Sequence, residues 1–123
     1  MKKKEFTGAC HCKKIKFKFL CEDNVSVIEC NCSICAHTRY LHLIVPHSYF
    51  TLLTKTSELT EYIFNTYKAK HFFCKICGIK SFYQPRSHPN SYSVNYYSII
   101  NPPKINNIIK FNGHEYEKNI DLL

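Results

Sequence analysis

The sequence predicts a mainly β fold of many short, twisted strands, and two observations lead to this prediction. Several short stretches alternate between apolar and polar residues or are rich in β-branched and aromatic residues, and none keeps a helical period. Seven of the eight cysteines fall into three tight clusters, which is typical of metal ligands that hold a small fold together. With 123 residues, nine Phe and nine Tyr, we expect one folded domain over residues 1–123.

The first strand is expected at residues 14–19, where apolar and polar residues alternate strictly. Ile15, Phe17 and Phe19 then share a buried face, opposite a row of lysines that is either solvated or a stripe for nucleic acid. Pro46 ends one later strand, and a short helical turn is expected after Cys32. The other expected strands are richer in aromatic and aliphatic residues, and they lie at 25–29, 40–45, 60–66, 69–73, 79–83, 92–98 and 105–111.

The charge and the absence of targeting segments restrict the class of protein. The formal net charge is +8, and seven thiolates with two zinc ions (−7 + 4) would lower it to about +5. Such a charge suits nucleic acid, acidic filaments or a small anionic substrate. No apolar run approaches the roughly 20 residues of a membrane span, and no export signal follows Met1. We therefore expect a soluble intracellular protein, cytoplasmic or nuclear, in which cysteines bind metal; a disulfide-stapled secreted domain is the alternative.

The two outer cysteine clusters are pairs. Cys10 and Cys12 would face the same side of a strand, with His11 on the other side. The second pair is followed by Gly78, whose positive φ would turn backbone N–H groups toward the sulfurs, as in a zinc knuckle. Together the pairs make a closed four-thiolate zinc site that stabilises the fold. Its ligands are Cys10, Cys12, Cys74 and Cys77.

The middle cluster offers three ligands, Cys30, Cys32 and Cys35. Three protein ligands with a fourth position for water or substrate are typical of a catalytic zinc site, so we expect two zinc ions per chain. Alternatively, a fourth protein ligand closes the site and makes it structural. The residues that could do so are Cys21, which is otherwise a buried thiol, His37, His42 and His71.

Three motifs carry a resemblance to a known family. They are the Cys-His-Cys segment at 8–12, the Cys-X-Cys-X-X-Cys segment at 30–35, and the segment at 73–89 that joins the last cysteine pair to Pro85-Arg86-Ser87. Over about residues 6–117 the chain resembles the glutathione-dependent formaldehyde-activating enzyme family, in its centromere protein V-like branch. The resemblance implies the β-tent (Mss4-like) fold, a structural zinc on the two pairs and a catalytic zinc on the triple.

The resemblance also implies a zinc-dependent carbon–sulfur lyase similar to S-(hydroxymethyl)glutathione synthase, which condenses or cleaves a thiol–aldehyde adduct. Arg86 is then expected to pair with a carboxylate of glutathione, or else to tie its own loop to backbone carbonyls. Tyr83, Asn95 and His37 are candidates to line the pocket; the alternative is that each is a core or surface residue. The alternative functions are a non-catalytic zinc-binding adaptor, similar to centromere protein V and binding chromatin or microtubules, and a purely structural scaffold. The sequence does not determine the oligomeric state.

Overall fold

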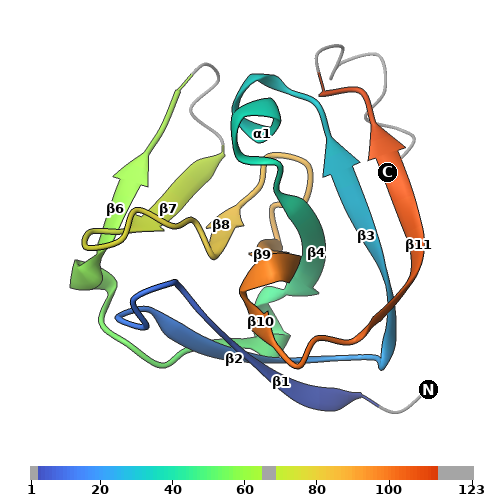
Figure 1. Ribbon diagram of the computed structural model, residues 1–123, viewed down its shortest axis with the longest axis horizontal. Coiled ribbons are helices and arrows are strands. Elements are labelled where there is room, and N and C mark those ends of the chain that lie inside the picture. The colour runs from blue at the N-terminus through green and yellow to red at the C-terminus, as the bar shows by residue number, and fades with distance from the viewer. Residues whose placement is uncertain (1–2, 65–68, 114–123) are drawn as a thin grey trace.

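The computed structural model describes residues 3–64 and 69–113, and eleven strands in these residues form two sheets (Figure 1). The smaller sheet has the order β10-β1-β2-β5, and the larger has the order β11-β3-β4-β9-β8-β7-β6. The strands are β1 (Lys4–Ala9), β2 (Lys16–Cys21), β3 (Asn24–Cys30), β4 (Leu41–Pro46), β5 (Phe50–Leu52), β6 (Leu59–Tyr62), β7 (Lys70–Cys74), β8 (Phe82–Gln84), β9 (Ser91–Asn95), β10 (Ile99–Ile100) and β11 (Lys104–Phe111).

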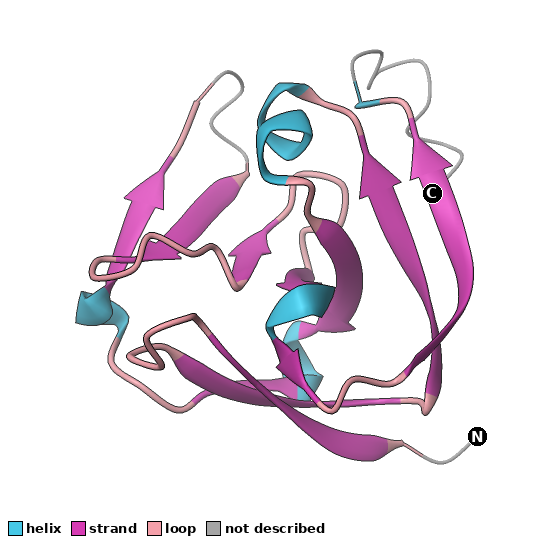
Figure 2. Ribbon diagram, in the orientation of Figure 1, coloured by secondary structure: helices cyan, strands magenta, loops and turns pink. Residues whose placement is uncertain are grey.

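Helices are short and few, as Figure 2 shows, and the prediction of a mainly β fold is confirmed. One α-helix, α1 (Ser33–Thr38), occurs in the described residues, at the place where a helical turn was expected. The 3₁₀ helices are η1 (His47–Tyr49), η2 (Thr56–Glu58) and η3 (Tyr96–Ser98). None of the helices in this part of the chain has the length and apolar character needed to cross a membrane.

The core lies between the two sheets and is centred on β2. Ile15, Phe17 and Phe19 are at most 1% exposed, whereas Lys14 and Lys16 are exposed, as the alternation predicts. The Phe17 ring lies 5.6 Å from that of Phe82 in the other sheet, so it joins the two sheets directly. Burial of each such aromatic ring contributes roughly 2 kcal/mol to stability.

β3 and β11 end together at one end of the larger sheet. β3 and β11 pair in parallel, with Lys104 beside Asn24 and Phe111 beside Cys30, whereas the other paired strands run antiparallel. Both strands therefore end next to α1, at the top of Figure 1. This end of the sheet carries the middle cysteine cluster.

Several expected elements differ from the structure. The stretch expected as a strand at 60–66 is a strand only to Tyr62, and residues 65–66 lie outside the described part. The strand expected at 79–83 begins at Phe82, because the chain before it is still turning away from the cysteine pair. The stretch at 96–98 is η3, since the Asn95 side chain accepts a hydrogen bond from the Tyr97 N–H (3.1 Å) and starts that turn. β1, β5 and β10 were not predicted.

Candidate metal centres and the adjoining cavity

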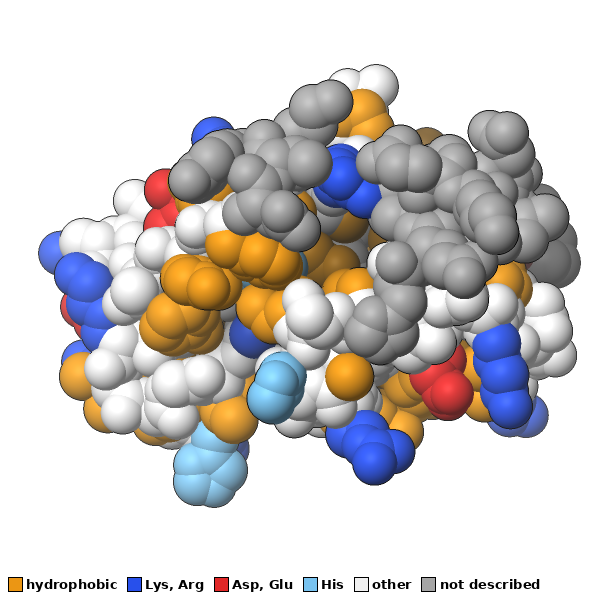
Figure 3. Space-filling model, turned by 90° about the horizontal axis from the view of Figure 1, so that it is seen from above, with side chains coloured by type: hydrophobic (Ala, Val, Ile, Leu, Met, Phe, Trp, Pro, Cys, Tyr) orange, Lys and Arg blue, Asp and Glu red, His pale blue; other side chains and the backbone are white. Residues whose placement is uncertain are grey.

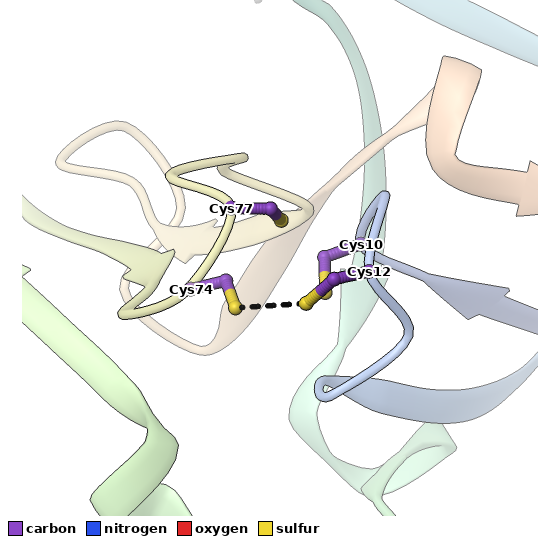
Figure 4. A group of neighbouring side chains, drawn as sticks. All are labelled: Cys10, Cys12, Cys74 and Cys77. Atoms are coloured by element: carbon purple, nitrogen blue, oxygen red, sulfur yellow. Dashed lines mark hydrogen bonds between the residues drawn. The ribbon is translucent and has the colours of Figure 1, made fainter.

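The two outer cysteine pairs meet in space, although they are far apart in sequence. One pair follows β1, the other lies at the end of β7 and in the turn after it, and their side chains face one another in Figure 4. All four sulfurs lie within 4.8 Å of one another, with 3.7 Å between those of Cys10 and Cys12 and 3.5 Å between those of Cys12 and Cys74. A tetrahedral zinc with Zn–S bonds of 2.3 Å requires sulfurs about 3.8 Å apart. The four thiols therefore fit a zinc ion.

A tight turn brings the first pair together. Cys10 and Cys12 do not lie on a strand, so the geometry expected from the sequence is wrong here. The Lys13 N–H donates to the Cys10 carbonyl (3.1 Å), and Lys13 takes a φ of 67°, in the left-handed region that favours glycine. The Ile15 N–H then donates to Cys10 Sγ (3.3 Å), so a backbone donor faces this sulfur.

The turn at the second pair has the expected form. Gly78 has a φ of 76°, and its N–H donates to the Cys74 carbonyl (2.9 Å). The Ile76 N–H points at Cys74 Sγ (3.3 Å). The prediction that a glycine with positive φ would turn backbone donors toward sulfur is confirmed.

The middle cluster spans the end of β3 and the start of α1. Cys30 ends the strand, Cys32 precedes the helix, Cys35 lies within it, and their sulfurs are within 4.8 Å of one another. The Cys32 N–H donates to Cys30 Sγ (3.4 Å). Hydrogen bonds from Cys30 and Cys35 lower the pKa of Cys32 to about 2. The cluster thus holds a negatively charged sulfur at neutral pH, which suits it to a soft divalent cation.

Two of the four side chains that the sequence offers as a fourth ligand lie elsewhere. Cys21 is at the end of β2, where its thiol donates to the Glu22 carbonyl (3.3 Å) and burial raises its pKa to about 11. His37 is exposed on α1. Neither belongs to the group of three sulfurs.

His42 approaches the cluster without joining that group. It is 4% exposed, and its Nε2 lies 3.3 Å from Cys35 Sγ. Its Nδ1 is 3.1 Å from the Tyr83 hydroxyl and 2.9 Å from the Ser93 hydroxyl. Burial lowers the pKa of His42 to about 3, so the ring is neutral. A hydroxyl then donates to Nδ1, and the Nε2–H donates to the sulfur.

His71, the fourth of these side chains, belongs to a second layer of polar groups. Strand register places His71, Tyr83 and Ser93 side by side on β7, β8 and β9. The His71 ring stacks on Tyr83 (4.8 Å, 15°), and its Nδ1 accepts from Lys80 Nζ (3.2 Å). Burial, and after it the charge of Lys80, lower the pKa of His71 to about 4. No signal in the sequence distinguishes Lys80 from the many surface lysines.

A cavity of about 310 Å³ opens beside the three sulfurs. In Figure 3 hydrophobic side chains gather in a hollow, with a Lys or Arg side chain near it. Arg86 and Tyr83 line the cavity together with the cluster, whereas His37 and Asn95 do not. The Asn95 amide instead donates to the Lys80 carbonyl (3.2 Å). The lining residues are Ile28, Cys30, Cys32, Ser33, Ile34, Cys35, His42, Ile44, Phe64, Ala69, His71, Tyr83, Pro85, Arg86, Ser87, Phe111 and Gly113.

Gly113 forms a close wall of this cavity. A Cβ atom at this position would lie 2.5 Å from Cys30 Sγ and 3.0 Å from the Cys32 nitrogen. Such distances are too short for any side chain, so the backbone after β11 can pass the cluster only as glycine. The cluster is therefore bordered by α1 on one side and by the chain after β11 on another.

Comparison with known proteins agrees with this arrangement. A family model described as glutathione-dependent formaldehyde-activating enzyme matches residues 5–116. A crystal structure of a Rhodobacter sphaeroides protein is similar to this chain, with 31% sequence identity and a TM-score of 0.67. The similarity covers 75% of this chain and 85% of that one. The family match extends over both cysteine groups and supports the predicted Mss4-like fold.

Proposed function

The chain belongs to the glutathione-dependent formaldehyde-activating enzyme family, and we propose from this that it is a zinc-dependent carbon–sulfur lyase. It would condense a small thiol such as glutathione with an aldehyde, or cleave the adduct. The observation that carries the proposal is the cavity of about 310 Å³ that the three sulfurs and Arg86 line together. A volume at the lower end of ligand pockets suits a small substrate.

The proposed reaction needs a deprotonated thiol beside a carbonyl carbon. The thiolate sulfur attacks that carbon, a carbon–sulfur bond forms, and the carbonyl electron pair moves to oxygen, which takes up the proton that the thiol released. Zinc bound by Cys30, Cys32 and Cys35 would lower the pKa of the thiol or polarise the carbonyl oxygen. The other ion, on the outer pairs, would stabilise the fold.

The residues that line the cavity would bind the substrate and keep water away from it. The Arg86 guanidinium is suited to a carboxylate, which it can bind through two parallel hydrogen bonds. Ile44, Phe64 and Phe111 make one part of the wall apolar. An apolar wall strengthens the electrostatic interactions of a bound substrate, because water is kept away from them.

A non-catalytic adaptor of the centromere protein V-like branch is the second candidate. Its support is the net charge of +8 and two exposed lysines, Lys14 just before β2 and Lys16 at its start, which offer a positive surface to chromatin or microtubules. In both proposals the protein works in the cytoplasm or nucleus, where thiols stay reduced. An open three-sulfur site beside a cavity favours the lyase.

Exchange NMR tests the lyase proposal. With ¹³C-formaldehyde and glutathione, the zinc-loaded protein should speed exchange between the free aldehyde and its thiol adduct, and Cys32→Ser should abolish this effect. Cobalt in place of zinc reports whether glutathione reaches the metal, through a change in its visible absorption. If millimolar glutathione neither accelerates exchange nor alters the cobalt spectrum, the lyase proposal fails and the adaptor is favoured.

A further inference from the structure

Lys80 is a buried cation close to the three-cysteine cluster, and no role in binding or fold has yet been given to it. We propose that Lys80 is the fixed counter-charge of this cluster, which allows the metal site to accept an anionic fourth ligand such as a thiolate. The inference rests on the proposed function for the identity of that ligand. It adds a residue that acts on the site without touching the substrate, since Lys80 does not line the cavity.

Among the described residues, no carboxylate forms an ion pair with Lys80. Lys80 is 8% exposed, which is rare for a lysine. Across residues 3–64 and 69–113 the only ion pair between side chains joins Lys4 and Asp23, on the surface. The Lys80 ammonium instead lies 4.3 Å from the centre of the Tyr83 ring and 4.9 Å from that of Tyr40. Aromatic faces attract a cation but do not neutralise it, and burial of an unpaired charge is costly.

The negative charge in this region belongs to the cysteines. Tyr83, beneath the ammonium, contacts His42 Nδ1 (3.1 Å), and His42 Nε2 contacts Cys35 Sγ (3.3 Å). Burial lowers the pKa of Lys80, whereas the sulfurs of Cys35, Cys32 and Cys30 act against this and raise it. The lysine and the three sulfurs therefore interact across a buried layer that consists of two polar rings.

Residues of two strands hold Lys80 in this position. The Asn95 amide donates to the Lys80 carbonyl (3.2 Å), and the Asn95 N–H donates to the Ser81 carbonyl (2.9 Å). The ammonium itself donates to His71 Nδ1 (3.2 Å). A residue of β9 thus holds the backbone of Lys80, and a residue of β7 holds its ammonium group.

The formal charge of the metal site indicates which ligands Lys80 would favour. Three thiolates and one divalent ion carry a formal charge of −1, and a fourth thiolate makes it −2. A nearby positive charge in a medium of low dielectric constant offsets the additional repulsion. Lys80 should therefore favour anionic fourth ligands and have little effect on neutral ones.

Ligand binding to the cobalt-loaded full chain tests this inference. The probes are 2-mercaptoethanol, which binds as a thiolate, and imidazole, which binds as a neutral ligand; both are followed by visible absorption at one pH. In Lys80→Met we expect about tenfold weaker thiol binding and imidazole binding within twofold of the wild type. Equal weakening for both ligands would mean a merely structural role, and no change for either would also overturn the inference.

Two further variants and the other metal site provide the controls. Lys80→Gln removes the charge but keeps a polar head group, so it should shift the ratio of the two affinities in the same way; an unchanged ratio in either variant refutes the inference. Lys55→Met, at an exposed position, should leave both affinities unaltered. The spectrum of cobalt at the four-cysteine site reports folding in every variant. Since no aldehyde or turnover is involved, a chain without lyase activity can still confirm the counter-charge, and an active chain can refute it.

Discussion

Cys21 is the one cysteine that belongs to neither group, and its surroundings make it a weak nucleophile. Burial raises its pKa to about 11, so the thiol form dominates at neutral pH. In the zinc-loaded protein we expect iodoacetamide to label Cys21 at pH 8 roughly tenfold more slowly than an exposed cysteine, because thiolate is scarce. The rate should rise with pH until about 11. Mass spectrometry of the labelled chain measures it, with Cys21→Ser as the control; fast labelling at pH 8 would contradict the prediction.

Arg86 should determine the affinity for substrates that carry a carboxylate. Lys in its place keeps the charge and loses the two parallel hydrogen bonds. For Arg86→Lys we expect KM for glutathione to rise about tenfold with kcat nearly unchanged, since the carboxylate lies away from the reacting atoms.

The matched control for this variant is 2-mercaptoethanol, a thiol without a carboxylate, whose kinetics should not change. Steady-state rates with both thiols measure the difference. An equal effect on both would show that Arg86 supports the loop rather than the substrate.

At the scale of single residues, the sequence was informative where chemistry is local. Cysteines within five positions of one another readily converge, so each of the three sequence clusters could be recognised as a set of metal ligands. That the two outer pairs share one site followed from the number of ligands that a closed zinc site needs. Lys80 could not be predicted, and the sequence offered His42 only as one of four possible fourth ligands, because the positions of both depend on which strands become neighbours. A lysine in the sequence is read as a surface residue until its burial is known.

At the scale of elements, β1 is held to β2 by a close contact that tolerates no side chain. A Cβ on Gly8 would collide with the ring of Phe17, which is fully buried. Gly8→Ala should lower the free energy of unfolding of the zinc-loaded protein by about 2 kcal/mol, because the ring cannot move without loss of packing.

Denaturant unfolding monitored by circular dichroism measures this change. Ala9→Ser, at the next position on β1, should have a smaller effect and serves as the control. If Gly8→Ala were as stable as the wild type, the ring of Phe17 would have room to move.

The same strand shows why some elements escaped prediction. β1 contains one large apolar residue, Phe6, and two small ones, so it carries no alternation signal. β5 and β10 have three and two residues, too few for any period to be recognised. β2 and β7 were predicted, because strict alternation in the first and a high aromatic content in the second indicate a strand with a buried face.

At the scale of the whole molecule, the two metal groups should contribute unequally to stability. The four-cysteine group joins β1 of the smaller sheet to β7 of the larger, whereas the three-cysteine group draws on adjacent segments of one chain region. Cys74→Ala should therefore unfold the protein, and Cys30→Ala should leave it folded but inactive.

Metal analysis and circular dichroism test this expectation. The wild type should bind two zinc ions, Cys30→Ala one, and Cys74→Ala should show the spectrum of an unfolded chain. Equal loss of stability in both variants would mean that both groups are structural.

The wall that Gly113 forms against Cys30 and Cys32 also has a consequence for protein synthesis. The four-cysteine group contains no residue beyond Cys77, so it can close while the ribosome is still translating the rest of the chain. The other group reaches its final surroundings only after β11 has emerged and paired with β3. A nascent chain would thus acquire its stabilising metal first, and its reactive thiols would remain open to solvent until the last strand is in place.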